Sequence, residues 1–220
     1  MRRARAGDPG GLWIAGWEQT KGRGRQGRVW YSPHGNLAAS LLLIDPAPTN
    51  LAPQLGFVAG VALAEAARDL LPVGKPAQLK WPNDLVVGRR KLAGLLVERP
   101  SAQVAVVGVG LNLAARWEGD LADQRTSLTD HGAPLSTDTA SQITALTAIR
   151  RYLLEASGLL RAGSFAQLLP TLRERDVLRG HEVGVENGHR VHRGTATGID
   201  GEGHLLIEGL PIVSGTITSW

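Results

Sequence analysis

The first half of the chain alternates short apolar runs with one long segment of helical periodicity. The apolar runs predict strands at residues 12–18, 37–44, 78–81, 84–98 and 104–112. Within the fourth run, two apolar stretches flank Gly-Arg-Arg at 88–90, a pattern typical of a β-hairpin. Over residues 51–71 the apolar positions recur at helical spacing, which predicts an amphipathic helix with Thr49 or Asn50 as its N-cap.

Two further helices are predicted in the second half. A stretch of low regularity extends to about Pro134. A helix is then predicted to begin at Ser136, Thr137 or Asp138, because each can cap the apolar residues of helical spacing that follow. A second helical piece is expected near residues 164–178.

The end of the chain has the pattern of a small β module. From Gly180 onward, short alternating runs predict four or five strands. An Asn-Gly pair at 187–188 marks one turn, and glycines at 201 and 203 mark another. The change of pattern predicts two domains, at residues 1–176 and 177–220.

Composition narrows the class of protein. The 220 residues are 43% hydrophobic and 20% charged, which is enough apolar content for a sizeable core. The chain has no cysteine, and this excludes disulfides, cysteine-ligated zinc and a cysteine nucleophile. No apolar run approaches the ~20 residues of a membrane span, and the basic N-terminus lacks the apolar region of a secretory signal. We therefore expect a soluble cytoplasmic protein.

The chain is basic, with a net charge of +4 and a pI of about 9.9, and residues 22–28 read GRGRQGR. Glycine lets the backbone approach a ligand closely, and arginine supplies planar, permanently charged donors for phosphate or carboxylate. The segment indicates a flexible anion-binding loop, for a nucleotide or for nucleic acid. An exposed basic loop without a specific ligand is an equal alternative. The P-loop pattern G-x-x-x-x-G-K-[ST] is absent.

A second cluster is KWPND at residues 80–84, followed by Lys91. Pro82 biases Trp81 toward extended structure, so that the polar Asn-Asp pair stands at the start of a strand. Lys91, across the predicted hairpin, could return to the neighbourhood of Asp84. The alternative is an ordinary turn dipeptide beside surface lysines.

A third cluster is GVGLN at residues 108–112. Glycine weakens a strand, so Gly108 and Gly110 suggest that another group approaches the backbone there. Asn112 can both donate and accept hydrogen bonds, although turn chemistry is the commonest reason for asparagine at a strand end. The histidines of the tail are expected to be surface residues, and no metal site is assigned.

Together, QTKGRGRQGRVWYSPHGN, KWPND, RKLAGLLVE and GVGLN resemble the motifs of biotin protein ligases, in the order that this family has. The β module is similar to the SH3-like C-terminal domain of the family. The resemblance covers nearly the whole chain, from about 12 to 220. It implies an α/β (α+β) catalytic domain with a mixed sheet, followed by a small SH3-like β-barrel.

The resemblance also implies a reaction in two halves. Biotin and ATP, with Mg²⁺, would give biotinyl-5′-AMP and pyrophosphate, and a lysine of a biotin carboxyl carrier domain would then attack the mixed anhydride. By analogy, the catalytic residues would be Arg23, Lys91, Lys80 and Asp84. The biotin-binding residues would be Gln19, Gly22, Arg23, Lys91, Gly94, Leu96, Gly108 and Gly110. The residues that bind ATP or the adenylate would be Arg23, Arg25, Trp30, Asn83 and Asn112.

Within this set, the resemblance gives three finer expectations. Trp30 would flank the adenine, and Asn112 would reach it. Asp84 would orient the incoming lysine of the carrier domain.

The resemblance is incomplete at the N-terminus. Family members carry an upstream segment with a Ser-Thr-Asn type motif that contacts biotin, and residues 1–11 resemble the end of the helix and loop that follow it. Either the native start lies upstream, as the intact later motifs favour, or the chain is a truncated, weak or inactive relative. We expect an open biotin pocket and weakened biotin affinity for the chain as given. The helix-turn-helix of repressor-type members is lacking too, so DNA binding is not predicted, and a homodimer stays open.

Three rival functions remain at this point. A lipoate- or octanoate-type protein ligase or transferase would have a similar fold, but GRGR together with KWPND and KLAG favours biotin. A basic nucleic-acid-binding protein would account for the pI and would bind with strong salt dependence. A truncated, non-catalytic scaffold is the third.

Overall fold

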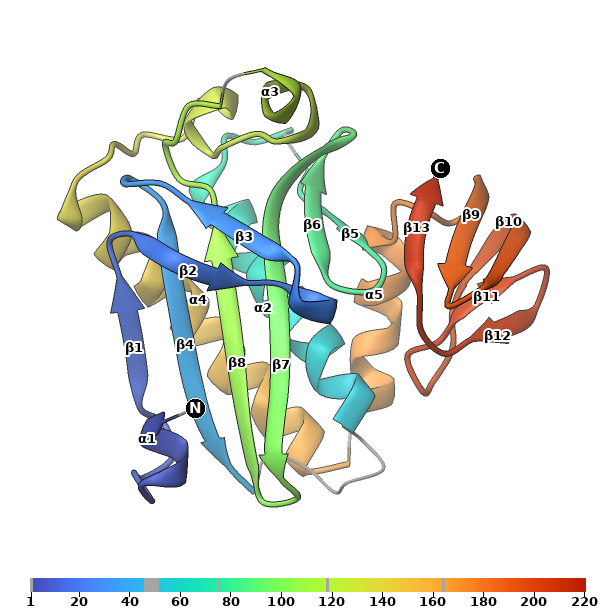
Figure 1. Ribbon diagram of the computed structural model, residues 1–220, viewed down its shortest axis with the longest axis horizontal. Coiled ribbons are helices and arrows are strands. Elements are labelled where there is room, and N and C mark those ends of the chain that lie inside the picture. The colour runs from blue at the N-terminus through green and yellow to red at the C-terminus, as the bar shows by residue number, and fades with distance from the viewer. Residues whose placement is uncertain (1, 46–51, 75, 118, 164) are drawn as a thin grey trace.

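The computed structural model describes residues 2–45, 52–74, 76–117, 119–163 and 165–220. At its centre is a six-stranded sheet with the strand order β1-β4-β8-β7-β6-β5 (Figure 1). The strands are β1 Trp13–Gly16, β4 Leu37–Ile44, β5 Gln78–Lys80, β6 Asp84–Val87, β7 Arg90–Ser101 and β8 Val104–Leu111. Each apolar run predicted as a strand or hairpin therefore lies in this sheet, and the α/β class is confirmed.

The expectation of a mixed sheet needs a correction. Every ladder between described strands of the six-stranded sheet is antiparallel. Parallel pairing among the described residues is limited to isolated bridges, of Leu79 with Asp176 and of Lys91 with Arg125. Short connections such as those between β6, β7 and β8 return the chain directly, which makes neighbouring strands antiparallel.

Two long helices, α2 Ala52–Leu70 and α4 Thr139–Arg161, cover one face of the sheet (Figure 1). The helical spacing over 51–71 is confirmed, but α2 is buried nearly all round, because the sheet, α4 and later elements enclose it. Its proposed N-caps lie outside the described residues. Of the three candidates for the start of α4, Asp138 is the N-cap, and its carboxylate accepts a hydrogen bond from the Ser141 amide at 2.7 Å. None of the described helices is long and apolar enough to span a membrane.

The other face of the sheet is crossed by a ribbon of two strands, β2 Gln19–Arg23 and β3 Val29–Ser32 (Figure 1). The loop predicted at residues 22–28 is wrong for Gly22 and Arg23, which belong to β2, whereas residues 24–28 form the tip between the two strands. A Cβ at position 22 would lie 2.3 Å from the Trp30 carbonyl oxygen, so Gly22 permits the close pairing of the two strands. The tip is a 3-10 turn, η1 Arg25–Gly27, in which Gln26 has a φ of 57°.

Short elements complete the first 175 residues. They are α1 Arg2–Arg5, α3 Asp120–Gln124, the 3-10 turns η3 Thr129–His131 and η4 Phe165–Leu168, and α5 Leu169–Arg175. The helical piece expected near 164–178 corresponds to η4 and α5. The stretch of low regularity before Pro134 contains α3 and η3.

The chain ends in a five-stranded antiparallel sheet with the order β12-β11-β10-β9-β13. Its strands are β9 Glu182–Asn187, β10 Arg190–Ile199, β11 Leu205–Ile207, β12 Leu210–Ile212 and β13 Thr216–Ser219. This sheet, residues 177–220, is called the β module below. The prediction of four or five strands is confirmed; its SH3-like classification and the boundary at 176/177 are proposals.

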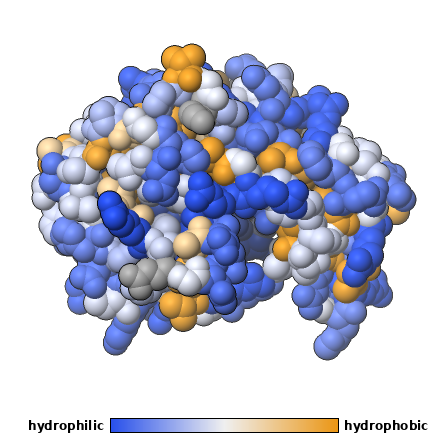
Figure 2. Space-filling model, turned by 90° about the horizontal axis from the view of Figure 1, so that it is seen from above, coloured by the Kyte–Doolittle hydropathy of each residue, from blue (hydrophilic) through white to orange (hydrophobic). Residues whose placement is uncertain are grey.

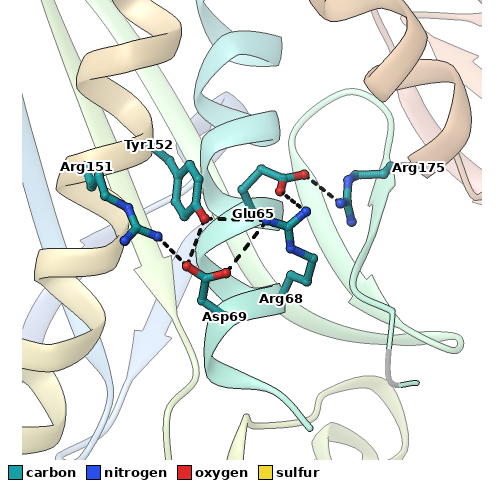
Figure 3. A network of polar contacts seen from close by, with 6 residues as sticks. All are labelled: Glu65, Arg68, Asp69, Arg151, Tyr152 and Arg175. Carbon is teal, nitrogen blue, oxygen red and sulfur yellow. Dashed lines mark hydrogen bonds and ion pairs between the residues drawn. The ribbon is translucent and has the colours of Figure 1, made fainter. Parts of the chain in front are cut away.

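A network of polar side chains connects α2, α4 and α5, the helices on the face of the sheet opposite the ribbon (Figure 3). Glu65 of α2 binds Arg175 of α5 and Arg68, each at 2.6 Å. Asp69 accepts a hydrogen bond from the Tyr152 hydroxyl of α4 at 2.8 Å. The side chains of Glu65 and Arg175 are only 15% and 14% exposed, so this pair is better shielded from salt than an ordinary surface pair. The network fixes α4 and α5 against α2.

Asp176 lies at the junction between α5 and the β module. It is 6% exposed, and burial raises the pKa of its carboxyl to about 6. One carboxylate oxygen accepts a hydrogen bond from the Leu178 amide at 3.0 Å, and the other has no partner among the described residues. The next residue, Val177, donates its amide to the Leu79 carbonyl of β5 at 3.0 Å. This carboxyl therefore sits where the two sheets join.

The raised pKa predicts that Asp176 makes stability depend on pH. Its contribution is fully present below the unfolded value near 3.8 and is lost as the pH rises through about 6, because only the folded state then holds the proton. From about pH 4 to 7, Asp176→Asn should gain roughly 2–3 kcal/mol of unfolding free energy relative to the unchanged chain. Urea denaturation of both proteins across this range measures it, and a difference that stays constant with pH would contradict it.

Candidate active site

A cavity of about 760 Å³ opens between the β2–β3 ribbon and the sheet face beneath it. Its walls come from the ribbon, from β7 and β8, from residues 80–84, and from two later segments at 123–125 and 215–217. The last segment belongs to the β module, so both sheets contribute to the cavity. Seen from above, the surface of the molecule is mainly hydrophilic, and apolar residues appear only in small separate groups (Figure 2).

The floor of the cavity is a pair of neighbouring strands with glycines in register. Gly94 of β7 pairs with Gly110 of β8, and Leu96 pairs with Gly108. The Trp30 indole lies on this floor: a Cβ at Gly110 would come within 2.5 Å of the ring, and one at Gly94 within 3.0 Å. A Cβ at Gly108 would meet nothing nearer than 3.4 Å. The close approach predicted for this strand is found at Gly110, where the approaching group is the Trp30 indole.

Two cations lie over the Trp30 ring. The Lys91 ammonium is 5.2 Å and the Arg125 guanidinium 5.3 Å from the ring centre, distances typical of cation–π interactions. The indole N–H of Trp30 is buried and has no partner among the described residues. Trp30 therefore brings an aromatic face and a free donor to a place where positive charge converges.

Lys91 and Asp84 form an ion pair at 2.5 Å, with side chains that are 29% and 23% exposed. The β6–β7 hairpin brings them together, since Asp84 pairs with Gly94 in the register of the sheet. The predicted return of Lys91 to Asp84 is thus confirmed. Beside them, Asn83 is held by β7: its side-chain amide donates to the Leu95 carbonyl at 2.7 Å.

The arginine-rich tip of the ribbon reaches the opposite wall. Arg25 donates to the Asn83 side-chain oxygen at 3.5 Å and to the Gly215 carbonyl at 3.4 Å. Arg28 donates to the Thr216 hydroxyl at 2.9 Å. Burial lowers the pKa of the Arg25 guanidinium, and the nearby Asp84 carboxylate opposes that shift. The tip is therefore ordered by contacts with the Asn83 segment and with the β module.

Lys80 is a partly buried lysine that lines the cavity. Burial lowers the pKa of its ammonium, and the Asp84 carboxylate counteracts this in part. The Trp220 ring lies 5.1 Å from the Lys80 ammonium and 4.5 Å from the Arg89 guanidinium. An ammonium that is partly desolvated interacts strongly with anions, because water competes less for it.

The described lining is strongly cationic. Eight basic side chains face three acidic ones, which are Asp84, Glu98 and Asp123. The basic ones are Lys21, Arg23, Arg25, Arg28, Lys80, Arg89, Lys91 and Arg125. Such a cavity lowers the cost of bringing several anionic groups close together.

The structure brings most of the predicted site residues to this one cavity. Those that line it are Gln19, Arg23, Arg25, Trp30, Lys80, Asn83, Asp84, Lys91, Gly94, Leu96, Gly108 and Gly110. Gly22 and Asn112 are outside the described lining.

Asn112, which was expected to reach adenine, is fully buried and does not belong to the described lining of the cavity. Its side-chain amide donates to the carbonyls of Lys91, at 3.2 Å, and Thr126, at 2.9 Å. In this structure the amide is engaged with the backbone, so Asn112 fixes the chain around Lys91. Gly22 allows β2 and β3 of the ribbon to pair closely.

Among the residues that sequence reasoning missed are Arg125, which lines the cavity, and Trp220, which packs on the Lys80 and Arg89 side chains outside the described lining. Arg125 lies between Trp30 and Trp117, 4.9 Å from the Trp117 ring centre, and donates to the Tyr31 carbonyl at 3.3 Å. It comes from the stretch of low regularity, where no periodicity marked it. Trp220 stands on the β module, and its position beside Lys80 depends on the packing of the two sheets.

The described residues hold no carboxylate cluster for a metal inside the cavity. Asp200, Glu202 and His204 could hold an ion, but they lie in the β10–β11 loop. His204 is half-buried there, with Nδ1 at 3.0 Å from the Asp200 carboxylate.

Comparison with known proteins places these features in a family. Residues 7–112 match the model of the Biotin/lipoate A/B protein ligase family. The chain is 43% identical over 111 residues to the biotin–[acetyl-CoA-carboxylase] ligase of Paracoccus denitrificans, covering 48% of this chain and 45% of that protein. It is 34% identical over 215 residues to the ligase of the same name from Mycobacterium tuberculosis, covering 94% of this chain and 77% of that protein.

The fold agrees with a solved member. Biotin protein ligase from Aquifex aeolicus, in complex with biotin and ATP, superposes with a TM-score of 0.80 at 29% identity, covering 94% of this chain and 87% of that one. The chain spans less than two thirds of the length of the first curated relatives that it matches, which are proteins from Paracoccus denitrificans and Escherichia coli.

Proposed function

The chain belongs to the biotin protein ligases of the biotin/lipoate A/B protein ligase family, and from this premise we propose that it joins biotin to a lysine of a biotin carboxyl carrier domain at the expense of ATP. In the first half-reaction a biotin carboxylate oxygen attacks the α-phosphorus of ATP, giving biotinyl-5′-AMP and releasing pyrophosphate. In the second, the carrier lysine amine attacks the acyl carbon, forming an amide and releasing AMP.

The observation that carries this proposal is the cationic, glycine-floored cavity beneath the ribbon. Biotin carboxylate and ATP are both anions, so their approach is repulsive in water. Fixed cations in an enclosed site offset that repulsion and stabilise the charge that builds at the α-phosphorus. The cavity volume of about 760 Å³ lies in the range of ligand sites, so it is large enough for biotin beside a nucleotide.

We assign the residues to two halves of the cavity. The biotin half comprises the floor of Gly94, Leu96, Gly108 and Gly110, with Gln19 at the ribbon side. Gly22 lies outside the described lining and supports this half through the pairing of β2 with β3. The adenylate half comprises Arg23, Arg25, Asn83, Arg125 and Trp30, whose indole lies over Gly94 and Gly110 and so borders the biotin half. Lys91 lies between them, where it would contact both the biotin carboxylate and the α-phosphate.

Asp84 acts mainly in the transfer step of the proposal. Its present partner is Lys91, at 2.5 Å. Once Lys91 is engaged by ligand anions, Asp84 is free to accept a hydrogen bond from the carrier lysine and to orient its amine toward the acyl carbon. Lys80, beside it, adds positive charge at the reaction centre.

Mg²⁺ belongs to the proposal as a companion of ATP. The carboxylates that line the described cavity are Asp84, Glu98 and Asp123, and they form no ligand cluster of their own. This donor set does not fit a resident metal, whereas Mg²⁺ is commonly held through substrate phosphates.

The proposal also includes a protein partner and a cellular location. The carrier domain of a biotin-dependent carboxylase is the protein partner, and the use of ATP agrees with a cytoplasmic location. A homodimer is compatible with the proposal, and DNA binding is not part of it. The SH3-like β module, residues 177–220, would act together with the catalytic domain, residues 1–176, because residues 215–217 line the cavity.

Biotin-dependent exchange of labelled pyrophosphate into ATP tests the first half-reaction without a carrier. The proposal expects exchange that requires biotin and is not supported by lipoate or octanoate at equal concentration. Exchange with lipoate and not with biotin would assign the chain to the other branch of the family. Absence of exchange with either acid would refute adenylation by this chain.

A further inference from the structure

The β10–β11 loop of the β module, residues 200–204, is stiffened by one of its own side chains. Asp200 accepts hydrogen bonds from the amides of Glu202, at 2.8 Å, and His204, at 2.9 Å. The backbone closes the same turn, with the Gly203 amide donating to the Asp200 carbonyl at 3.2 Å. A loop braced in this way keeps its shape when it contacts another element.

This loop packs tightly against α2 and Trp81 of the catalytic domain. Gly203 has a φ of +90°, and a Cβ there would lie 2.4 Å from the Phe57 ring of α2. Gln54 of α2 donates its side-chain amide to the Gly201 carbonyl at 3.0 Å. The Trp81 indole N–H donates to the Gly203 carbonyl at 3.2 Å. Two backbone carbonyls of the loop thus hold two buried side chains of the larger domain.

Trp81 is 3% exposed and directly precedes the polar centre of the site. The chain continues through Pro82 to Asn83, whose carbonyl and side-chain amide are both bonded to Leu95 of β7. Asp84 follows, paired with Lys91. The segment is therefore held at one end by the β module and at the other by β7.

Given the ligase function proposed above, we propose that the 200–204 loop is a positioning element for adenylation: Gly203 holds Trp81, and Trp81 fixes the place of Asn83 and Asp84 against Lys91. Gly203 and Trp81 are then positioning residues, which act through the groups that face the cavity. The β module takes part in the chemistry through this contact.

Gly203→Ala tests the proposal, because the added methyl cannot fit against Phe57. Gly209→Ala is the matched control: Gly209 is in the same module, also has a positive φ, +81°, and has nothing within 4 Å of the built Cβ. We expect Gly203→Ala to lower kcat for biotinyl-AMP formation about tenfold or more, with KM for ATP within about threefold, since small misplacements are costly. Gly209→Ala should retain kcat within about twofold.

The double variant Gly203→Ala/Phe57→Ala separates positioning from stability. Removing the ring makes room for the methyl but deletes a buried aromatic side chain. Positioning predicts that kcat recovers while the thermal midpoint falls further. If kcat instead falls with the midpoint, or if Gly203→Ala and Gly209→Ala have equal kcat, the proposal is overturned.

A measurement without substrates keeps the outcome independent of the proposed ligase activity. Amide hydrogen exchange around residues 83–84 should be faster in Gly203→Ala than in the unchanged chain and in Gly209→Ala. Equal exchange in all three proteins would overturn the positioning role even if the chain forms no adenylate. An unchanged chain that forms no adenylate would count against the function alone.

Discussion

Replacing Lys91 with methionine is expected to lower kcat/KM for biotinyl-AMP formation by roughly 10²–10³-fold, the loss that follows removal of one well-placed charged donor. Lys91 is the cation on the floor side of the cavity, 2.5 Å from Asp84 and 5.2 Å from the Trp30 ring centre. Without it, Asp84 loses its ion-pair partner and repels the two anionic substrates more strongly. The methionine side chain keeps most of the apolar stem, so packing should change little.

Arg90→Met is the matched control for Lys91→Met. It removes a cation from the neighbouring position of β7, but the Arg90 side chain is exposed and does not line the described cavity. Initial rates of biotin-dependent pyrophosphate release measure both variants. Equal losses in the two would mean that general positive charge, and no specific contact of Lys91, supports adenylation.

The second large effect is expected for Gly110→Ala. The new methyl carbon would sit 2.5 Å from Trp30 indole atoms, so the ring must leave its place on the floor. Lys91 and Arg125 both lie over that ring and would be displaced with it. We expect kcat/KM for adenylation to fall about 100-fold, as for a misplacement of about 1 Å at a reacting centre.

Gly108→Ala provides the comparison for Gly110→Ala. It adds the same methyl two residues earlier on the same face of β8, where the nearest atom is the Leu96 carbonyl oxygen at 3.4 Å. The loss should be much smaller than for Gly110→Ala. Similar losses in the two variants would show that any added methyl on the floor blocks the ligand. Displacement of the Trp30 ring would then not be the cause of the loss in Gly110→Ala.

Much of the fold was predictable because the spacing of apolar residues along the chain reflects which side chains are buried. Apart from Ser40, the runs that became β4 and β8 have no polar side chain, as expected for central strands covered on both faces. Asp138 was among the predicted caps because short polar side chains satisfy free amides at a helix start. The β2–β3 ribbon was missed, since Gly22 reads as a strand breaker until the close approach of the Trp30 backbone is known.

The site residues were predictable where a local sequence motif contains the reactive side chains. They were less predictable where only tertiary packing brings a side chain to the cavity. Lys91 and Asp84 were expected to meet because a hairpin joins them, and they do. Asn112 carries the right groups for a ligand, yet the fold engages its amide with backbone carbonyls. Arg125 reaches the cavity, and Trp220 reaches Lys80, through contacts between distant segments, which leave no local pattern.

Carrier biotinylation tests the central claim most directly. The chain is incubated with biotin, ATP, Mg²⁺ and an apo biotin carboxyl carrier domain, and the product is detected with streptavidin, beside Lys91→Met and a carrier whose acceptor lysine is replaced by arginine. The account predicts a signal that requires biotin and ATP, is lost with the altered carrier and falls strongly in Lys91→Met. No signal from the unchanged chain, or an equal signal from Lys91→Met, would contradict it.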